Sequence, residues 1–204
     1  MKTLLWNIWK VGRWAIAAFV VLFVGLVLYR IPAVTEEDRT AEAVKYIQEQ
    51  KITLADVTGE RLPPRPDQTL ADATIEGIDT NKNGIRDDVE RAIFDRYPGN
   101  ENIKIRAAML QYAKEQQVYL TSVFNSETWV AAIKHRGKGI GCLVDVAFEK
   151  YTDIKDQINK SDEWREYVDG LIFDSDQRLK KKEEADRFEA AYAGGGGDMC
   201  DVEL

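Results

Sequence analysis

The chain has 204 residues, a net charge of −7 and an apolar fraction of 45%. This content is enough for one packed domain of ordinary size, and it argues against global disorder. The acidic balance, without an extended basic face, argues against nucleic acid as a partner.

The first 34 residues differ in charge from the rest. They carry four basic residues and no acid, so this segment has a charge of +4. Taken from the total of −7, it leaves −11 for the remaining residues. Two unlike parts therefore meet near residue 34. We expect a membrane anchor over residues 1–34 and an extracytoplasmic domain over residues 35–204.

Residues 14–29 read WAIAAFVVLFVGLVLY, which are sixteen uncharged residues between Arg13 and Arg30. As a helix they span roughly 24 Å, and the flanking arginines can reach outward to extend that span. The sequence predicts an uncleaved signal anchor with a transmembrane helix at about residues 14–30. A cleaved signal peptide and a buried core helix are the alternatives.

The region after the anchor predicts a mostly α fold, an irregular helical domain with one helix–loop–helix motif. The residues TEED at 35–38 have the pattern of a capping box, which predicts a helix from there to about Gln50. Three prolines make residues 58–68 an extended linker. Short helices are expected at 70–78 and 89–97, on either side of an Asn- and Gly-rich loop.

Two longer helices follow, because apolar residues keep helical spacing over 102–123 and over 126–151. Gly137 and Gly141 lie within the second of these segments. Glycine weakens a helix by about 1 kcal/mol. We therefore expect either a close approach of another helix or a kink at this place.

The last third of the chain predicts two more helical segments and a tail. Ser161 is expected to cap one segment, and residues 174–176 to end it and cap a charged helix that runs to about Tyr192. The sequence GGGGD at 194–198 predicts a flexible joint for a tail over 194–204.

Residues 79–90 read DTNKNGIRDDVE, with side-chain oxygens at alternating places before a glycine and a glutamate at the twelfth place. This spacing resembles EF-hand loops and, more closely, the calcium loops of thrombospondin type 3 repeats. The resemblance covers twelve residues and implies one Ca²⁺. The implied ligands are Asp79, Asn81, Asn83, the backbone carbonyl of Ile85, Asp87 and Glu90.

The loop differs from paired EF-hands in two ways, and both limit the function that the resemblance implies. Arg86 occupies the eighth place, where paired EF-hands carry an apolar residue, and the sequence has no second loop. We therefore expect a lone structural ion with a dissociation constant of about 10⁻⁴ to 10⁻³ M rather than a calcium sensor. The alternative is a metal-free Asx turn that caps a helix.

The only two cysteines are Cys142 and Cys200. In an oxidising compartment we expect them to form a disulfide that fastens the tail; two free thiols are the alternative. The basic run at 134–138 contains the only histidine. It is expected to be a solvated helix face, or else a site for a phosphate or an acidic partner. The sequence contains no nucleotide-binding motif or motif of a hydrolase.

These features predict a non-catalytic protein of a bacterial inner membrane, with a single span and a calcium-stabilised, disulfide-containing domain in the periplasm. Its role would be to bind or support the assembly of an envelope protein partner. A small envelope hydrolase with unidentified catalytic carboxylates is one alternative. A scaffold that faces the cytoplasm, with free thiols and no metal, is another.

Overall fold

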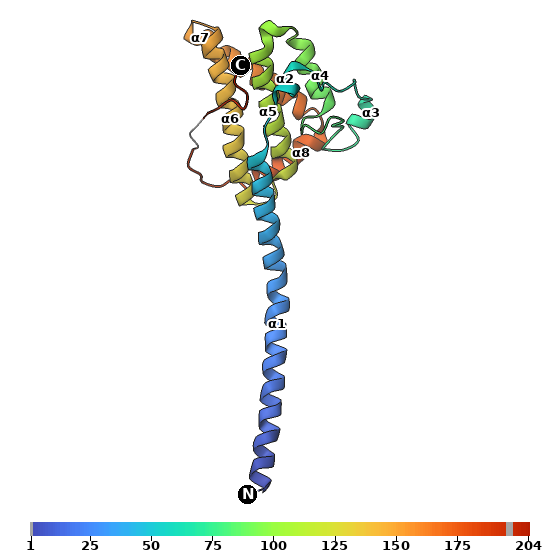
Figure 1. Ribbon diagram of the computed structural model, residues 1–204, viewed down its shortest axis with the longest axis vertical. Helices are drawn as coiled ribbons and strands as arrows, with labels where there is room; N and C mark the ends of the chain where they lie inside the picture. The colour runs from blue at the N-terminus through green and yellow to red at the C-terminus, as the bar shows by residue number, and fades with distance from the viewer. Residues whose placement is uncertain (1, 195–197) are drawn as a thin grey trace. The chain divides into compact units, whose positions relative to one another are not determined.

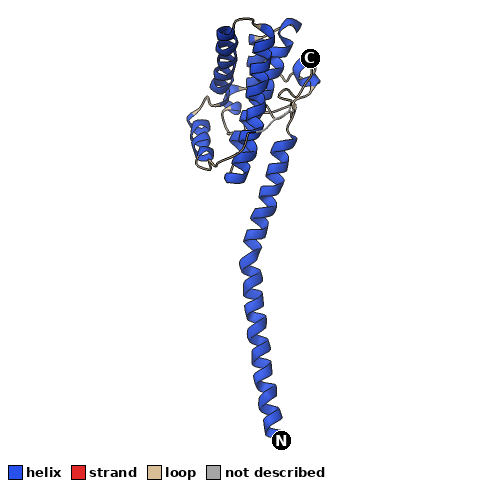
Figure 2. Ribbon diagram, turned by 90° about the vertical axis from the view of Figure 1, so that its left-hand side faces the viewer, coloured by secondary structure: helices blue, strands red, loops and turns tan. Residues whose placement is uncertain are grey.

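The structure is a computed structural model that describes the backbone of residues 2–194 and 198–204. In the first helix it describes side chains from residue 12 on, except those at 15, 17–18, 27–29 and 31–33. The chain divides into two compact units, Met1–Glu42 and Ala43–Leu204. The described residues form helices and loops without a strand (Figure 2). The predicted mostly α class is therefore confirmed.

The N-terminal unit holds the first part of helix α1 (Lys2–Glu49). The prediction that a helix begins at Thr35 is wrong, because α1 continues through the TEED residues. Their side chains are exposed, so the helix can pass through them without burying a charge. The sequence also has no glycine between Gly25 and Gly59 that would end the helix.

The predicted membrane span at about 14–30 lies in this first part of α1. Among the residues described by the structure, no helix is long and apolar enough to cross a membrane. Several side chains of the predicted span, at 15, 17–18 and 27–29, lie outside the described set. The transmembrane helix therefore stays a prediction.

Helix α5 (Ile103–Ser122) is the central helix of the second unit, and it follows a short 3-10 turn, η1 (Asn100–Asn102). All of its residues from Ile105 to Leu120 are buried. Figure 1 shows the helices around it. It contacts α2 (Leu54–Thr58), α4 (Asp87–Arg96), α6 (Ser126–Lys150), α7 (Ile154–Ile172) and α8 (Asp176–Asp186). Polar side chains on α5 must therefore find partners inside the protein.

Short connections join α5 to α6 and α6 to α7, so these neighbours pack as antiparallel pairs. Asn125 begins α6 by accepting a hydrogen bond from Thr128 N at 2.9 Å. Asp153 begins α7 by accepting two backbone amides of its first turn. The prediction that Ser161 caps a helix is wrong. Ser161 lies within α7, and its hydroxyl donates to the carbonyl oxygen of Ile158 at 2.9 Å.

The helix predicted at 70–78 is shorter in the structure, where α3 (Gln68–Ala71) ends after one turn. Arg178, on α8, donates to the carbonyl oxygens of Ala71, Thr74 and Ile75 at 2.7, 3.0 and 3.3 Å. In a longer α3, these carbonyl oxygens would accept hydrogen bonds from backbone amides of the same helix. Here they accept hydrogen bonds from the guanidinium group of Arg178 instead. A contact from a distant part of the chain therefore ends this helix.

Other boundaries also differ from the sequence prediction. Helix α2 was not predicted; it begins after Thr53, whose amide and hydroxyl both donate to Asp56 Oδ2, at 2.8 and 2.7 Å. Helix α4 begins two residues before the predicted start at 89. Helix α8 begins after Ser175 as predicted, but it ends at Asp186 rather than near residue 192. The predicted joint at 194–198 lies outside the described residues at 195–197.

Candidate functional site

The backbone of the 79–90 loop turns sharply twice, at Lys82 with φ 56° and at Gly84 with φ 84°. Glycine is needed at the second turn for its positive φ and for space. A Cβ added at Gly84 would lie 3.1 Å from Cε of Lys114, a buried lysine on α5. The loop therefore lies directly against the central helix.

Every second side chain in the first part of the loop accepts hydrogen bonds from backbone amides of the loop. The carboxylate of Asp79 accepts the amides of Asn83 and Gly84 at 3.1 and 2.8 Å. Asn81 Oδ1 accepts the amide of Asn83 at 3.2 Å, and Asn83 Oδ1 accepts the amide of Ile85 at 2.9 Å. These successive Asx turns direct three of the predicted ligand side chains toward the inner side of the loop.

Asp87 has a different role from these three residues. Its two carboxylate oxygens accept the amide and the hydroxyl of Thr80, at 2.9 and 2.6 Å. Its own amide donates to the carbonyl oxygen of Ile78 at 2.8 Å. Asp87 therefore ties the beginning of the loop to the first turn of α4, and both of its carboxylate oxygens have protein partners.

Glu90 is fully buried on α4. Its Oε2 accepts a hydrogen bond from Asn81 Nδ2 at 3.0 Å, whereas its Oε1 is buried without a partner. Burial, together with the nearby charges of Asp56 and Asp87, raises the pKa of Glu90 to about 7. An unpaired buried acceptor costs about 1–3 kcal/mol. A cation would offset this cost, so Glu90 fits the role of a metal ligand.

Only some of the predicted calcium ligands lie close to one another in the structure. Asp79, Asn81 and Asn83 are joined through the loop, and Asn81 contacts Glu90, but Asp87 faces Thr80. Within the described residues, no three His, Cys, Asp or Glu side chains lie together in a way that could hold a metal ion. The neutral amides of the two asparagines would therefore have to supply part of the coordination.

Arg86 explains why the eighth position of this loop is not apolar. Its side chain is fully buried, and Nη2 donates to Asp174 Oδ2 at 2.8 Å and to the carbonyl oxygen of Leu171 at 2.9 Å. Its Nε and Nη2 also bind the carboxylate of Asp88. The loop is thus anchored to the turn between α7 and α8. The sequence contained no local signal for this partner, which lies 88 residues further along.

The predicted pair Cys142 and Cys200 forms a disulfide. The basic run at 134–138 is not one solvated face, because only its two lysines and Gly137 are exposed. His135 is 8% exposed, and its Nε2 lies 2.7 Å from the carbonyl oxygen of Gln50. Arg136 lies over the ring of Tyr119. Burial acts to lower the pKa of Arg136, but interactions with Tyr112 and Asp169 outweigh it and raise this pKa above its ordinary value.

The glycines of α6 differ in how closely other parts of the protein approach them. A Cβ at Gly139 would collide with Glu115 and would lie 3.0 Å from the Cα of Tyr112 on α5. A Cβ at Gly141 would lie 2.7 Å from the side chain of Met199, and one at Gly137 would contact nothing within 4 Å. The close helix–helix approach expected at Gly137 and Gly141 therefore occurs at Gly139.

Neither a family model, nor a curated protein, nor a solved structure matches this chain. The function is therefore inferred from the geometry of the loop, from the ion-pair network and from the disulfide.

Proposed function

We propose that this chain is a membrane-anchored helical protein of the bacterial envelope, stabilised by one Ca²⁺ and without catalytic activity. Its C-terminal domain would lie in the periplasm, where it binds or supports the assembly of another envelope protein. The observation that carries the calcium proposal is Glu90 Oε1, a buried carboxylate oxygen without a protein partner at the twelfth position of the loop.

The chemistry of the loop supports a hard cation, because its polar side chains offer only oxygen ligands. Asp79, Asn81, Asn83, the carbonyl of Ile85 and Glu90 would bind the ion directly. Asp87 would act through a water molecule, because it occupies the ninth position of the loop, where the ligand often binds through water, and its carboxylate faces Thr80. The ion would hold the loop to α4, which is a structural role.

The N-terminal anchor is supported by the exposed apolar side chains of α1. Between Arg13 and Arg30 the described large side chains are at least 47% exposed, and Trp14 is 78% exposed. Exposed apolar surface costs about 25 cal/mol per Å² in water, and a lipid environment removes this cost. The flanking arginines are suited to the headgroup region.

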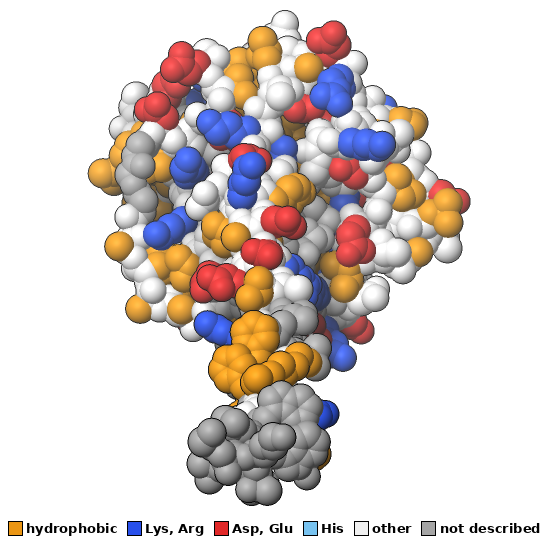
Figure 3. Space-filling view, turned by 60° about the horizontal axis from the view of Figure 1, so that its bottom comes forward, with side chains coloured by type: hydrophobic (Ala, Val, Ile, Leu, Met, Phe, Trp, Pro, Cys, Tyr) orange, Lys and Arg blue, Asp and Glu red, His pale blue; other side chains and the backbone are white. Residues whose placement is uncertain are grey.

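A binding role for the domain is supported by its surface. Ile154 and Ile158 are 66% and 51% exposed and lie one turn apart on α7, so they share a face. On the face shown in Figure 3, basic and acidic side chains are interspersed, which favours a protein partner over nucleic acid.

Calcium binding is tested by melting the full chain in detergent, with EDTA or with 10 mM Ca²⁺. Near 10 mM the ion should raise stability by about 1.4–2.7 kcal/mol for the expected dissociation constant, which corresponds to a melting temperature roughly 3–11 °C higher. Glu90→Gln should remove this rise without lowering the melting temperature in EDTA, because it also removes a buried carboxylate.

Glu166→Gln is the matched control, because Glu166 is an exposed carboxylate on α7. This variant should keep the calcium response of the unchanged protein. If the unchanged protein shows neither a heat of binding nor a melting shift at millimolar Ca²⁺, the loop is a metal-free Asx turn.

The anchor and its orientation are tested separately. The full chain should remain with the membrane after alkaline carbonate extraction. In spheroplasts, an added protease should digest the domain without lysis. Release by carbonate would contradict the anchor, and protection of the domain in intact spheroplasts would contradict its periplasmic location.

A further inference from the structure

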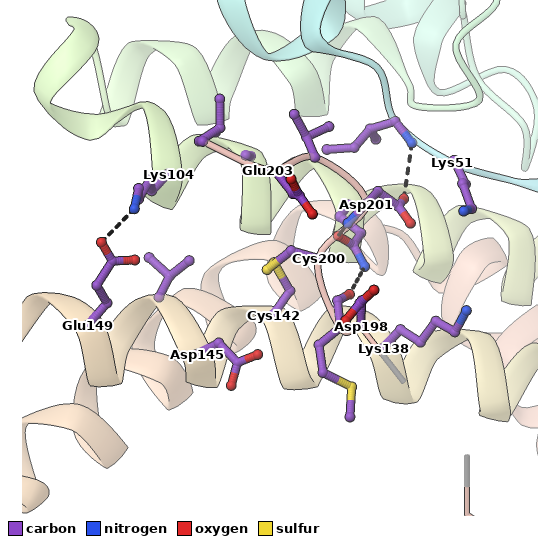
Figure 4. A pocket seen from close by; sticks show the side chains of 17 residues that line it. Lys51, Lys104, Lys138, Cys142, Asp145, Glu149, Asp198, Cys200, Asp201 and Glu203 are labelled. Atoms are coloured by element: carbon purple, nitrogen blue, oxygen red, sulfur yellow. Dashed lines mark hydrogen bonds and ion pairs between the residues drawn. A yellow bond between two sulfur atoms is a disulfide. The ribbon is translucent and has the colours of Figure 1, made fainter. Parts of the chain in front are cut away.

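The segment 198–204 lies in a groove formed by α5, α6 and residues 51–52 (Figure 4). The Cys142–Cys200 disulfide joins the middle of this segment to α6. In the sequence, four glycines at 194–197 precede it. A bound segment that follows a glycine-rich run has the arrangement of a tethered ligand.

Gln111 on α5 binds the backbone of the segment. Its Nε2 donates to the carbonyl oxygen of Met199 at 2.8 Å, and its Oε1 accepts the amide of Asp201 at 2.9 Å. In an extended peptide these two backbone groups point the same way, so one side-chain amide can bind both, as a neighbouring strand would. Gln111 is 1% exposed, so water competes little for these bonds.

The groove also recognises two side chains of the segment. The amide of Ile52 donates to Asp201 Oδ2 at 3.1 Å. The side chain of Met199 lies against Gly141, where an added Cβ would come within 2.7 Å of its sulfur. The contacts therefore select an acidic residue two positions after a long apolar one.

The recognising amide is held in place by the two helices themselves. Gln111 Nε2 also donates to Glu115 Oε1 at 3.2 Å, and Glu115 Oε2 accepts the amide of Gly139 at 2.8 Å. These contacts involve only α5 and α6. The binding groups are thus preorganised whether or not the segment is present.

The segment does not fill the groove. A cavity of about 680 Å³ remains beside it, and Lys51, Lys104 and Lys138 are among the lining residues (Figure 4). The segment itself carries three acidic side chains, Asp198, Asp201 and Glu203. The groove's own lining adds Asp145 and Glu149, and Glu149 is ion-paired with Lys104. Lys51, Lys138 and the Ile52 amide, which binds Asp201, are therefore the groups that favour an acidic peptide as the occupant.

We propose that this groove is a binding site for a short acidic peptide, that residues 198–204 occupy it in cis, and that the Cys142–Cys200 disulfide controls whether it is open. A dithiol reductant would attack Cys200, which is less buried than Cys142. Two electrons and two protons pass to the two cysteines, and the reductant leaves as its own disulfide. The proposal does not depend on calcium binding.

After reduction the segment remains tethered, at an effective concentration of the order of millimolar. It would still compete with a free peptide. A full-length variant that lacks both the disulfide and the anchoring carboxylate removes this competition: Cys142→Ser, Cys200→Ser and Asp201→Ala together. The probe is a fluorescent peptide of residues 198–204 that keeps Asp201 and carries Cys200→Ser.

Fluorescence anisotropy of this peptide tests the proposal. We expect saturable binding to the triple variant, at least tenfold weaker binding to the reduced unchanged protein, and none to the oxidised protein. Adding Gln111→Leu to the triple variant should weaken binding tenfold or more, because two backbone hydrogen bonds are lost. A peptide with Asp201→Asn should also bind more weakly.

Hydrogen exchange of the unchanged protein gives a second measurement that needs no variant. The amides of Ile52 and Asp201 should be protected in the oxidised chain and should exchange faster after reduction. Equal protection in both states would overturn the control by the disulfide. A triple variant that melts cooperatively but does not bind the peptide would overturn the peptide site.

Discussion

Arg86 Nη2 lies 2.8 Å from Asp174 Oδ2, and this contact joins the 79–90 loop to the turn between α7 and α8. Arg178 Nη1 binds the other oxygen of the same carboxylate at 2.7 Å. The side chains of Arg86 and Arg178 are 0% and 1% exposed. Asp174 therefore helps to neutralise two buried charges, and Asp88 and Asp72 each contact one of them.

Asp174→Ala should lower the free energy of unfolding by about 3 kcal/mol, since it removes one of the two carboxylates that compensate each of two buried guanidinium groups. Urea denaturation measures this loss. Asp95→Ala is the control: it breaks an ion pair with Arg65 whose side chains are 70% and 49% exposed, so it should cost less than about 1 kcal/mol. Equal losses would contradict the central role of Asp174.

Gly139→Ala and Gly137→Ala should change stability in opposite directions. A methyl group at 139 collides with Glu115 and crowds the backbone of Tyr112, so we expect a loss of about 2 kcal/mol. A methyl group at 137 meets open space and improves helix propensity, so we expect a gain of up to about 1 kcal/mol. Thermal melting of both variants checks this. A loss at both positions would show that α6 needs glycine for another reason.

Glu115 makes stability depend on pH. Burial raises the pKa of Glu115 well above its ordinary value, although hydrogen bonds from Gln111 and Gly139 and the charge of Lys138 oppose the shift and Asp201 adds to it. The folded protein keeps a proton that the unfolded chain loses above about pH 4.5. The free energy of unfolding therefore falls as the pH rises from there, by at most about 1.4 kcal/mol per pH unit.

Glu115→Gln isolates this effect, because it keeps the shape and removes the charge. The difference in unfolding free energy, variant minus unchanged protein, should grow from pH 4.5 upward. Denaturant titrations at several pH values measure it. Titrating groups far from residue 115 remain unchanged in both proteins, so their contributions cancel. His135 Nδ1 lies 3.8 Å from Glu115 Oε1, so the difference reports Glu115 together with its effect on His135. A difference that stays constant with pH would mean that Glu115 is charged in the folded state.

Removing the disulfide should destabilise the second unit. A closed loop of 58 residues corresponds to about 4 kcal/mol of chain entropy. Cys142→Ser with Cys200→Ser should lose roughly this amount in urea denaturation, and a reductant should have the same effect on the unchanged protein. The double variant itself should not respond to reductant. A reductant effect in the double variant would point to a cause other than this bond.

Local signals in the sequence located much of this fold. The segments predicted at 102–123 and 126–151 match α5 and α6 within a residue at each end, because apolar spacing and caps such as Asn125 are local. The disulfide was predicted because the chain has only two cysteines. The Asx turns of the 79–90 loop also agree with its sequence pattern, whereas its calcium ion stays a prediction.

Contacts between distant residues account for most of what the sequence did not predict. The helix at 70–78 is cut short because Arg178, more than 100 residues away, takes its carbonyl oxygens. The partner of Arg86 and the binding of the segment 198–204 by Gln111 are equally distant in sequence. Ser161 and Asp153 are both residue types that commonly cap helices. The packing of α7, which is not visible in the local sequence, determines that the helix begins after Asp153.

The shared carboxylate of Asp174 also determines how parts of the second unit can open. Three segments without regular structure, around residues 71–75, 79–86 and 173–175, meet through Arg86 and Arg178. Isolated loops of this kind open independently and exchange their amide hydrogens quickly. Here none of the three can move away without exposing a buried charge in another. We therefore expect them to open together, as one cooperative unit.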